Sequence, residues 1–214
     1  QHINKIYVTF EKNQPFSNES ELLIQLLEGL PVEYNTSKRY VGGIDLSEKS
    51  LTNYLKFLVP SFRKSIKYQY IWEKTQAPYL LILHNDMLFT GDILGYFLEK
   101  IQDDIAVGTI GQCWNCPAFE KHCDGDRYFD FRPSAKEIDA LYKDWPIDRA
   151  VKQGVVGDGQ SAWPMPECRI NEYAVMFNMT KAKKMVFPYG SVRPFGIHNK
   201  VDFGIPWFRD ISLK

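Results

Sequence analysis

The apolar run Tyr79–Leu83 is followed at once by three polar residues, His84, Asn85 and Asp86. Open α/β sheets bind their ligands beyond the carboxyl ends of the strands, so this is the first place to look for chemistry. A carboxylate there can bind Mg²⁺ or Mn²⁺, and the Asn85 amide can bond a sugar hydroxyl or a phosphate. The alternative is that Asp86 caps the next helix or its turn, a common role for aspartate.

A second acidic position lies late in the chain, in the stretch 198–204. Asp202 could take a proton from a hydroxyl group as a general base, and His198 could assist it or bind a metal ion. The simpler interpretations are a helix N-cap for Asp202 and ordinary hydrogen bonding for His198.

The chain has four cysteines, Cys113, Cys116, Cys123 and Cys168. The first two form a Cys-x-x-Cys pair, and four thiolates complete a tetrahedral structural zinc site with no open position for water. His122 could replace one of the thiolates. Two disulfides, a redox pair and free thiols are the alternatives. Zinc is favoured because the chain shows no secretion signal, and the reducing cytosol disfavours disulfides.

The elements that must position these residues alternate along the chain. Strands are expected at 5–10, 32–34, 79–83, 106–110 and 172–177, and helices after Asn18, over 62–73, over 93–101 and over 180–185. Pairs with capping-box spacing, Asn18 with Glu21 and Ser134 with Glu137, mark two helix starts. This alternation predicts an α/β protein in which helices cover a mainly parallel sheet.

The stretch 79–111 resembles the middle of the inverting glycosyltransferases of family two, which have the GT-A fold. Those enzymes carry an Asp-x-Asp or Asn-Asn-Asp turn after such a strand, then a helix and a glycine-bearing strand, as in Val107–Gly111. The resemblance implies a GT-A-like three-layer fold, with a mainly parallel central sheet and helices on both faces. An irregular cysteine-containing insertion would be added to it.

The same resemblance implies roles for single residues. Asn35 and Ser37 lie where the family has Asp-Asn-Gly-Ser near the nucleotide, although Tyr34 replaces the acid. They would bind the donor together with Asn85 and Asp86, and Asp86 would hold the Mn²⁺ or Mg²⁺ ion. The family's base stands in a Glu-Asp pair, and Asp202 takes the place of its second acid. His198 is the next candidate for that catalytic role.

The implied reaction moves a sugar from a nucleoside-diphosphate donor to a hydroxyl of a glycan or lipid-linked acceptor, as in polysaccharide biosynthesis. We expect a single domain over 1–214. Residues 1–111 would form the nucleotide-sugar-binding half, 112–169 the cysteine-containing insertion and 170–214 the acceptor and catalytic end. A nucleotidyltransferase-like enzyme and a non-catalytic, zinc-stabilised binding module are the alternatives.

Composition and the lengths of the apolar runs disfavour nucleic-acid binding and membrane insertion. The 26 basic residues balance the 26 acidic ones, which disfavours nucleic acid as a partner. No apolar run reaches the length of a membrane span, so a cytoplasmic location is expected, with peripheral membrane attachment as the alternative. The start at Gln1 suggests a piece of a longer chain. The aromatic residues Trp163, Trp207 and Phe208 suit either a sugar platform or the core.

Overall fold

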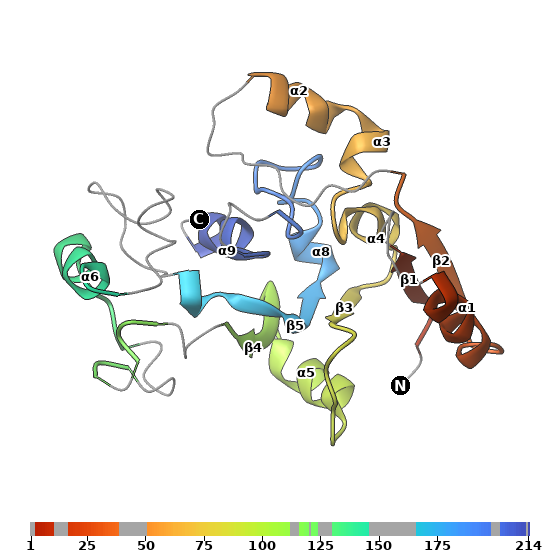
Figure 1. The fold of residues 1–214 in the computed structure, drawn as a ribbon, viewed down its shortest axis with the longest axis horizontal. Helices are drawn as coiled ribbons and strands as arrows, with labels where there is room; N and C mark the ends of the chain where they lie inside the picture. Colours follow the sequence, from red (N-terminus) through yellow and green to blue (C-terminus); the bar gives the residue numbers. More distant parts are fainter. Residues whose placement is uncertain are drawn as a thin grey trace.

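The structure is a computed structural model of the chain, and it describes residues 3–10, 17–38, 51–111, 116–119, 121–123, 130–145, 166–197, 202–212 and 214. The strands are β1 (Ile6–Phe10), β2 (Val32–Thr36), β3 (Tyr79–Leu83), β4 (Ala106–Ile110) and β5 (Ile170–Asn178). The helices are α1 (Ser17–Leu26), α2 (Leu51–Leu58), α3 (Pro60–Arg63), α4 (Gln69–Lys74), α5 (Ile93–Ile101), α6 (Ala135–Tyr142), α8 (Met179–Ala182) and α9 (Ile205–Ser212), with a 3₁₀ turn at Pro166–Cys168. Figure 1 shows this mixed α/β arrangement.

The strands form two small sheets. β1 and β2 pair in parallel, whereas β5 lies between β3 and β4 and is antiparallel to both. The expected mainly parallel central sheet is therefore wrong for the part of the chain that the structure describes. The expectation rested on the alternation of strands and helices along the chain, but alternation alone does not fix the direction of each strand in the sheet. The long connection between β4 and β5 lets β5 return in the opposite direction.

Helices cover both faces of the three-stranded sheet, as expected. On one face, Val175 and Phe177 of β5 pack in a cluster with residues of α4, α8 and α9. On the other face, Ala174 and Met176 pack with Phe97 and other residues of α5. β5 is consequently the most buried strand. Its packing on both faces fixes the position of the residues at its amino end.

Aromatic rings build the centre of the larger cluster. The Phe177 ring lies 4.8 Å from Trp72, 4.9 Å from Phe195 and 5.2 Å from Trp207 between centroids, all in edge-to-face geometry. Trp207 is 1% exposed and Phe208 9%. Both are core residues and cannot offer an open face to a sugar. Trp163 lies outside the described residues.

Several local predictions are confirmed. β3, α5 and β4 have the predicted bounds, and the Ser134–Glu137 capping box begins α6. By contrast, α1 begins at Ser17, so Asn18 lies inside the helix and does not precede it. The helix expected over 180–185 is the shorter α8.

The helix expected over 62–73 is interrupted. α3 ends at Arg63 and α4 begins at Gln69, and Tyr68 between them has a left-handed φ of 68°. Lys67 forms an antiparallel bridge with Gly196 there, which takes its backbone out of helical geometry. Apolar spacing over 62–73 could not reveal this tertiary contact.

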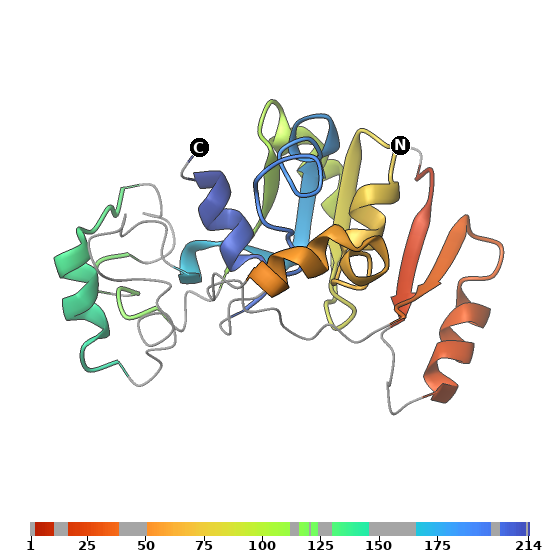
Figure 2. The same ribbon diagram turned by 90° about the horizontal axis from the view of Figure 1, so that it is seen from above.

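The β1–β2 pair lies beyond β3, on the side away from β5, in both Figure 1 and Figure 2. Glu33 of β2 anchors it to α4, through Lys74 and through the Tyr70 hydroxyl, which donates to its carboxylate at 2.8 Å. Hydrogen bonds from Lys74, Lys5 and Tyr70 lower the pKa of Glu33 to about 2. These polar contacts attach the β1–β2 pair to α4.

Candidate functional site

Three strand ends meet at one edge of the larger sheet. Leu83, the last residue of β3, pairs with Ala174, and Ile110, the last residue of β4, pairs with Ile170. Because β5 is antiparallel to both neighbours, its amino end lies beside their carboxyl ends. The register shifts between Gly108, which pairs with Val175, and Ile110, so residues 171–174 of β5 bulge out of the regular ladder with β4. We call this end of the sheet the carboxyl edge.

The His84–Asp86 turn lies on the carboxyl edge. The His84 N–H donates to the carbonyl oxygen of Tyr173 at 3.0 Å, and its ring packs edge-to-face on the Tyr173 ring. His84 Nδ1 and the Asp86 carboxylate form a hydrogen bond. The Asp86 side chain is 68% exposed, so it is accessible to a ligand. Asn85 is exposed as well.

Asp86 does not cap the next helix. The N-cap of α5 is Asp92, whose carboxylate accepts from the Gly95 N–H at 2.8 Å. The helix-capping alternative for Asp86 is therefore wrong, and its carboxylate bonds the His84 ring within the turn.

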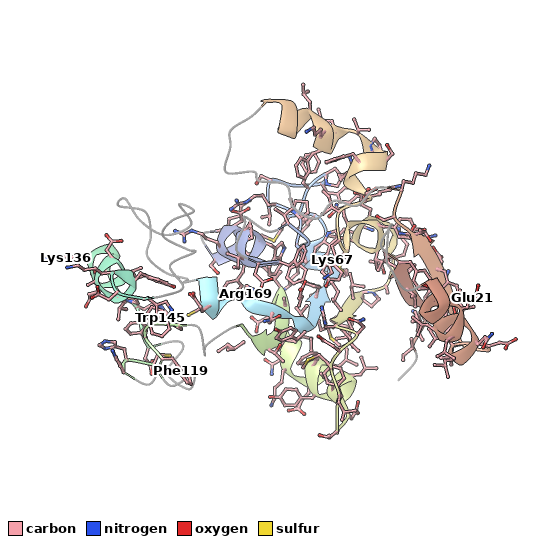
Figure 3. The ribbon with its side chains drawn as sticks, in the orientation of Figure 1. Glu21, Lys67, Phe119, Lys136, Trp145 and Arg169 are labelled. Atoms are coloured by element: carbon pink, nitrogen blue, oxygen red, sulfur yellow. The ribbon has the colours of Figure 1, made fainter. Side chains whose placement is uncertain are left out.

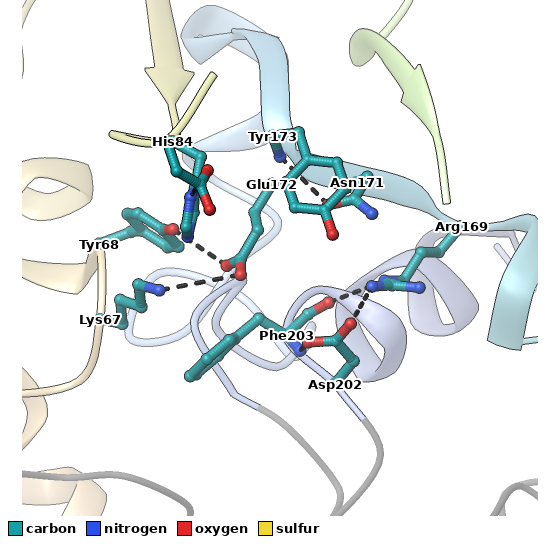
Figure 4. A network of polar contacts seen from close by, with 10 residues as sticks. Lys67, Tyr68, His84, Arg169, Asn171, Glu172, Tyr173, Asp202 and Phe203 are labelled. Atoms are coloured by element: carbon teal, nitrogen blue, oxygen red, sulfur yellow. Dashed lines mark hydrogen bonds and ion pairs between the residues drawn. The ribbon is translucent and has the colours of Figure 1, made fainter. Parts of the chain in front are cut away.

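Glu172 lies at the centre of the polar network in Figure 4. The Tyr68 hydroxyl donates to its Oε2 at 2.9 Å, and Lys67 Nζ lies 3.8 Å from its Oε1. The Glu172 side chain is 8% exposed. A carboxylate this buried needs such partners, because removing a charge from water is costly.

Asp202 is held in position by Arg169 and by the backbone of Phe203. Its carboxylate pairs with Arg169, accepts from the Phe203 N–H at 2.8 Å and remains 25% exposed. Arg169 is almost fully buried and also donates to the Phe203 carbonyl at 3.0 Å. α9 begins at Ile205, so Asp202 is not its N-cap. It fixes the turn that leads into the helix instead. His198 lies outside the described residues.

A buried amide at the carboxyl edge has a hydrogen-bond donor with no acceptor among the described residues. Asn171 is 1% exposed; its Oδ1 accepts from the Tyr173 N–H at 3.1 Å, and its Nδ2 has no acceptor among the residues that the structure describes. Buried donors are nearly always satisfied, so this one calls for a water molecule or a ligand.

The residues expected near the nucleotide lie at the end of β2. Ser37 is buried, and its hydroxyl donates to the Ser65 carbonyl at 3.2 Å, two residues before Lys67. Asn35 is half-buried within β2. Tyr34 stacks on Phe10 with centroids 6.0 Å apart. The Ser37–Ser65 bond thus brings the carboxyl end of β2 towards the segment that contacts Glu172.

The cysteines belong to a different part of the molecule. Cys116 and Cys168 are buried in one apolar cluster with Ile138 and Tyr142 of α6, and Cys123 is partly exposed. Figure 3 shows this end of the molecule around Phe119 and Trp145, away from Lys67. Cys113 lies outside the described residues, so zinc, disulfides and a redox pair all stay predictions.

A buried acid supports this second cluster. The Tyr142 hydroxyl donates to Glu167 Oε2 at 2.5 Å. Burial raises the pKa of Glu167, and burial together with the charge of Glu167 raises the pKa of Tyr142. Burial thus acts on both groups of this hydrogen bond, in which the Tyr142 hydroxyl is the donor.

The described side chains do not form a complete metal site: no three of His, Cys, Asp or Glu come together within the described ranges. Mg²⁺ in nucleotide sites is commonly bound through one or two carboxylates, and substrate phosphates supply further ligands. Asp86, with the His84 ring beside it, fits an ion that arrives on a diphosphate. It does not fit an ion that protein side chains alone would hold.

Sequence reasoning missed most of this network. Lys67 and Tyr68 fell within an expected helix, and Glu172 was the first residue of the strand expected over 172–177. One signal was present in the sequence: a glutamate at the start of a strand that continues with apolar residues needs a partner if it is buried.

Comparison of this chain with protein-family models, curated proteins and solved structures finds no match. In the described ranges, no helix is long and apolar enough to cross a membrane. The function therefore has to be argued from the carboxyl edge itself.

Proposed function

We propose that the protein is a glycosyltransferase that moves a sugar from a nucleoside-diphosphate donor to an acceptor hydroxyl with inversion. The observation that carries the proposal is the meeting of β3, β4 and β5 at the carboxyl edge, where three carboxylates differ in exposure. Asp86 is 68% exposed, Asp202 25% and Glu172 8%. This gradation suits one acid that meets the donor, one that meets the acceptor and one that organises the site.

The donor's phosphates would lie at the His84–Asp86 turn. Asp86 and His84 are the side chains that would hold a Mn²⁺ or Mg²⁺ ion accompanying the diphosphate, and such an ion neutralises charge on the departing phosphate. Asn85 is exposed beside them and can donate to a phosphate or sugar oxygen. Asn35 and Ser37 would contact the nucleoside side of the donor.

Asp202 is the proposed general base. The acceptor oxygen forms a bond to the anomeric carbon as its proton passes to the Asp202 carboxylate, and the bond from that carbon to the diphosphate oxygen breaks with its electron pair. Arg169 and the Phe203 N–H hold the carboxylate in position. Fixed orientation of a base is a recognised source of rate acceleration.

The test is donor turnover. With Mn²⁺ and a panel of nucleotide sugars, the protein is expected to release free nucleoside diphosphate. Asp86→Ala should abolish this release, whereas Asp144→Ala, which removes an exposed carboxylate elsewhere, should leave it unchanged. Release of pyrophosphate from nucleoside triphosphates would favour a nucleotidyltransferase. No turnover in either assay would favour a binding module.

Asp202→Asn separates the base from the donor site. Donor binding should stay near that of the wild type, because Asp202 meets only the acceptor. The transfer rate should fall by about 10²–10⁴, the range for a lost general base. Transfer that survives at more than about a tenth of the normal rate would mean that the base lies elsewhere.

A further inference from the structure

We propose that the Lys67 ammonium group binds the diphosphate of the donor. This inference rests on the proposed function and deepens it, because it assigns a specific cation to the donor's phosphates. Lys67 lies in the turn between α3 and α4, and Figure 4 shows its side chain directed at Glu172.

The Lys67 ammonium is attracted to its neighbours but is not hydrogen-bonded by them. Its Nζ lies 3.8 Å from Glu172 Oε1, beyond hydrogen-bond distance, and 4.4 Å from the centroid of the Phe203 ring. No hydrogen bond from this group occurs in the part of the chain that the structure describes. Three N–H donors are therefore ready for an acceptor on a side chain that is only 25% exposed.

The ion pair with Glu172 compensates a buried charge but leaves the hydrogen-bonding capacity of the ammonium unused. A lysine that serves a carboxylate closes to about 2.7–2.9 Å, and Glu172 already accepts a hydrogen bond from Tyr68 at 2.9 Å. The Phe203 and Tyr68 rings hold the ammonium by cation–π attraction at 4.4 Å and 5.3 Å from their centroids. Aromatic faces fix the position of a cation and leave its hydrogen atoms unused.

The backbone holds Lys67 firmly in this place. Lys67 bridges to Gly196, where an added Cβ would overlap the Lys67 carbonyl oxygen. The next residue, Tyr68, has a left-handed φ of 68°, which is uncommon for a residue that carries a side chain. Lys67 is thus directed at the carboxyl edge by tertiary contacts and is not a solvated surface lysine.

The ligand class follows from charge and position. Glu172, Asp202 and Asp86 outweigh Lys67 and Arg169 at this edge, so an anionic ligand needs an available cation, and Arg169 is already paired with Asp202. Lysine commonly contacts phosphate as a point charge. Glu172 adjoins Tyr173, which bonds the His84 backbone, so Lys67 lies at the same end of β3 as the proposed donor turn.

The experiment measures binding by titration calorimetry with inorganic pyrophosphate and with ADP, CDP, GDP and UDP, each with Mn²⁺. Lys67→Met should weaken binding of pyrophosphate and of the preferred diphosphate by about 10- to 100-fold, the loss expected for a charge-assisted hydrogen bond. Lys64→Met, which changes an exposed lysine three residues away, should stay within about twofold of wild type. Binding of the matching unphosphorylated nucleoside should not change.

A second variant guards against misfolding. Lys67→Met combined with Glu172→Gln removes the uncompensated buried carboxylate and should show the same loss of pyrophosphate affinity. Unchanged pyrophosphate affinity in a folded variant that lacks Lys67, or a wild-type protein that binds no pyrophosphate, overturns the inference.

The outcomes separate this inference from the proposed function. Sugar transfer with diphosphate affinity that is independent of Lys67 rejects the Lys67 assignment alone. Diphosphate affinity that depends on Lys67 without any sugar transfer upholds the assignment and rejects the glycosyltransferase.

Discussion

The two halves of β5 are both buried, but one is apolar and the other is polar. In its carboxyl half, Ala174, Val175, Met176 and Phe177 are all at most 1% exposed and pack into apolar clusters on both faces. In its amino half, Asn171 and Glu172 are buried nearly as deeply but are polar or charged, and so is Arg169 directly before the strand. Burying charge is expensive, so the polar half depends on its ion pairs and hydrogen bonds. The comparison teaches that the apolar half holds the fold, and we propose that the polar half serves donor binding.

The largest expected effect on stability lies in the apolar half. Phe177→Ala should lower the free energy of unfolding by about 3–5 kcal/mol, because it removes a ring from the centre of an aromatic cluster. Chemical denaturation followed by tryptophan fluorescence measures it. Leu26→Ala on α1, where the side chain is 71% exposed, is the control and should change stability by less than about 0.5 kcal/mol. A loss below about 1 kcal/mol for Phe177→Ala would contradict the assignment of the core.

The next effect concerns Arg169, the buried cation directly before β5. Arg169→Met should cost about 2–4 kcal/mol, because it breaks a buried pair and leaves Asp202 without its guanidinium. Adding Asp202→Asn should recover part of that loss, as a double-mutant cycle would show. Strictly additive losses would mean that the two residues stabilise the chain independently.

A smaller effect should appear in the pH dependence of stability. Burial holds the pKa of Glu167 above its usual value, so the folded chain retains this proton to higher pH than the unfolded chain. Its stabilising contribution is present below the unfolded value, near 4.5, and is lost as the pH rises through the folded value. Glu167→Gln keeps an acceptor for the Tyr142 hydroxyl and has no charge to bury. Melting temperatures between pH 4 and pH 8 should therefore fall less in this variant, and parallel profiles would contradict the prediction.

The smallest effect on stability belongs to Asp86. Asp86→Ala should change the free energy of unfolding by less than about 0.5 kcal/mol, because the side chain is mostly exposed and caps no helix. Its effect should appear in nucleoside-diphosphate affinity with Mn²⁺, measured by calorimetry. Unchanged affinity would remove Asp86 from the donor site.

Local patterns in the sequence predicted the local structure well. The apolar run of β3, the helical spacing of α5 and the glycine-bearing strand β4 have the predicted bounds because neighbouring residues determine them. The direction of β5 was predicted wrongly, because it depends on the long connection after β4 and on no pattern within the strand.

In the candidate site, too, some residues could be predicted from local patterns and others could not. Asp86 could be predicted, since it follows a buried strand. Lys67 could not, because only its bridge to Gly196 takes it out of an apparently helical stretch and towards Glu172. Arg169 and Asp202 are far apart in the sequence, and no spacing rule connects them.

The most direct test of the central claim is a crystal structure of the protein with Mn²⁺ and the nucleoside diphosphate that binds best. The account predicts diphosphate density at the carboxyl edge, with phosphate oxygens near Asp86 and Lys67 Nζ. Ordered nucleotide elsewhere on the protein, with this edge empty, would contradict the assignment of the polar half of β5 to donor binding.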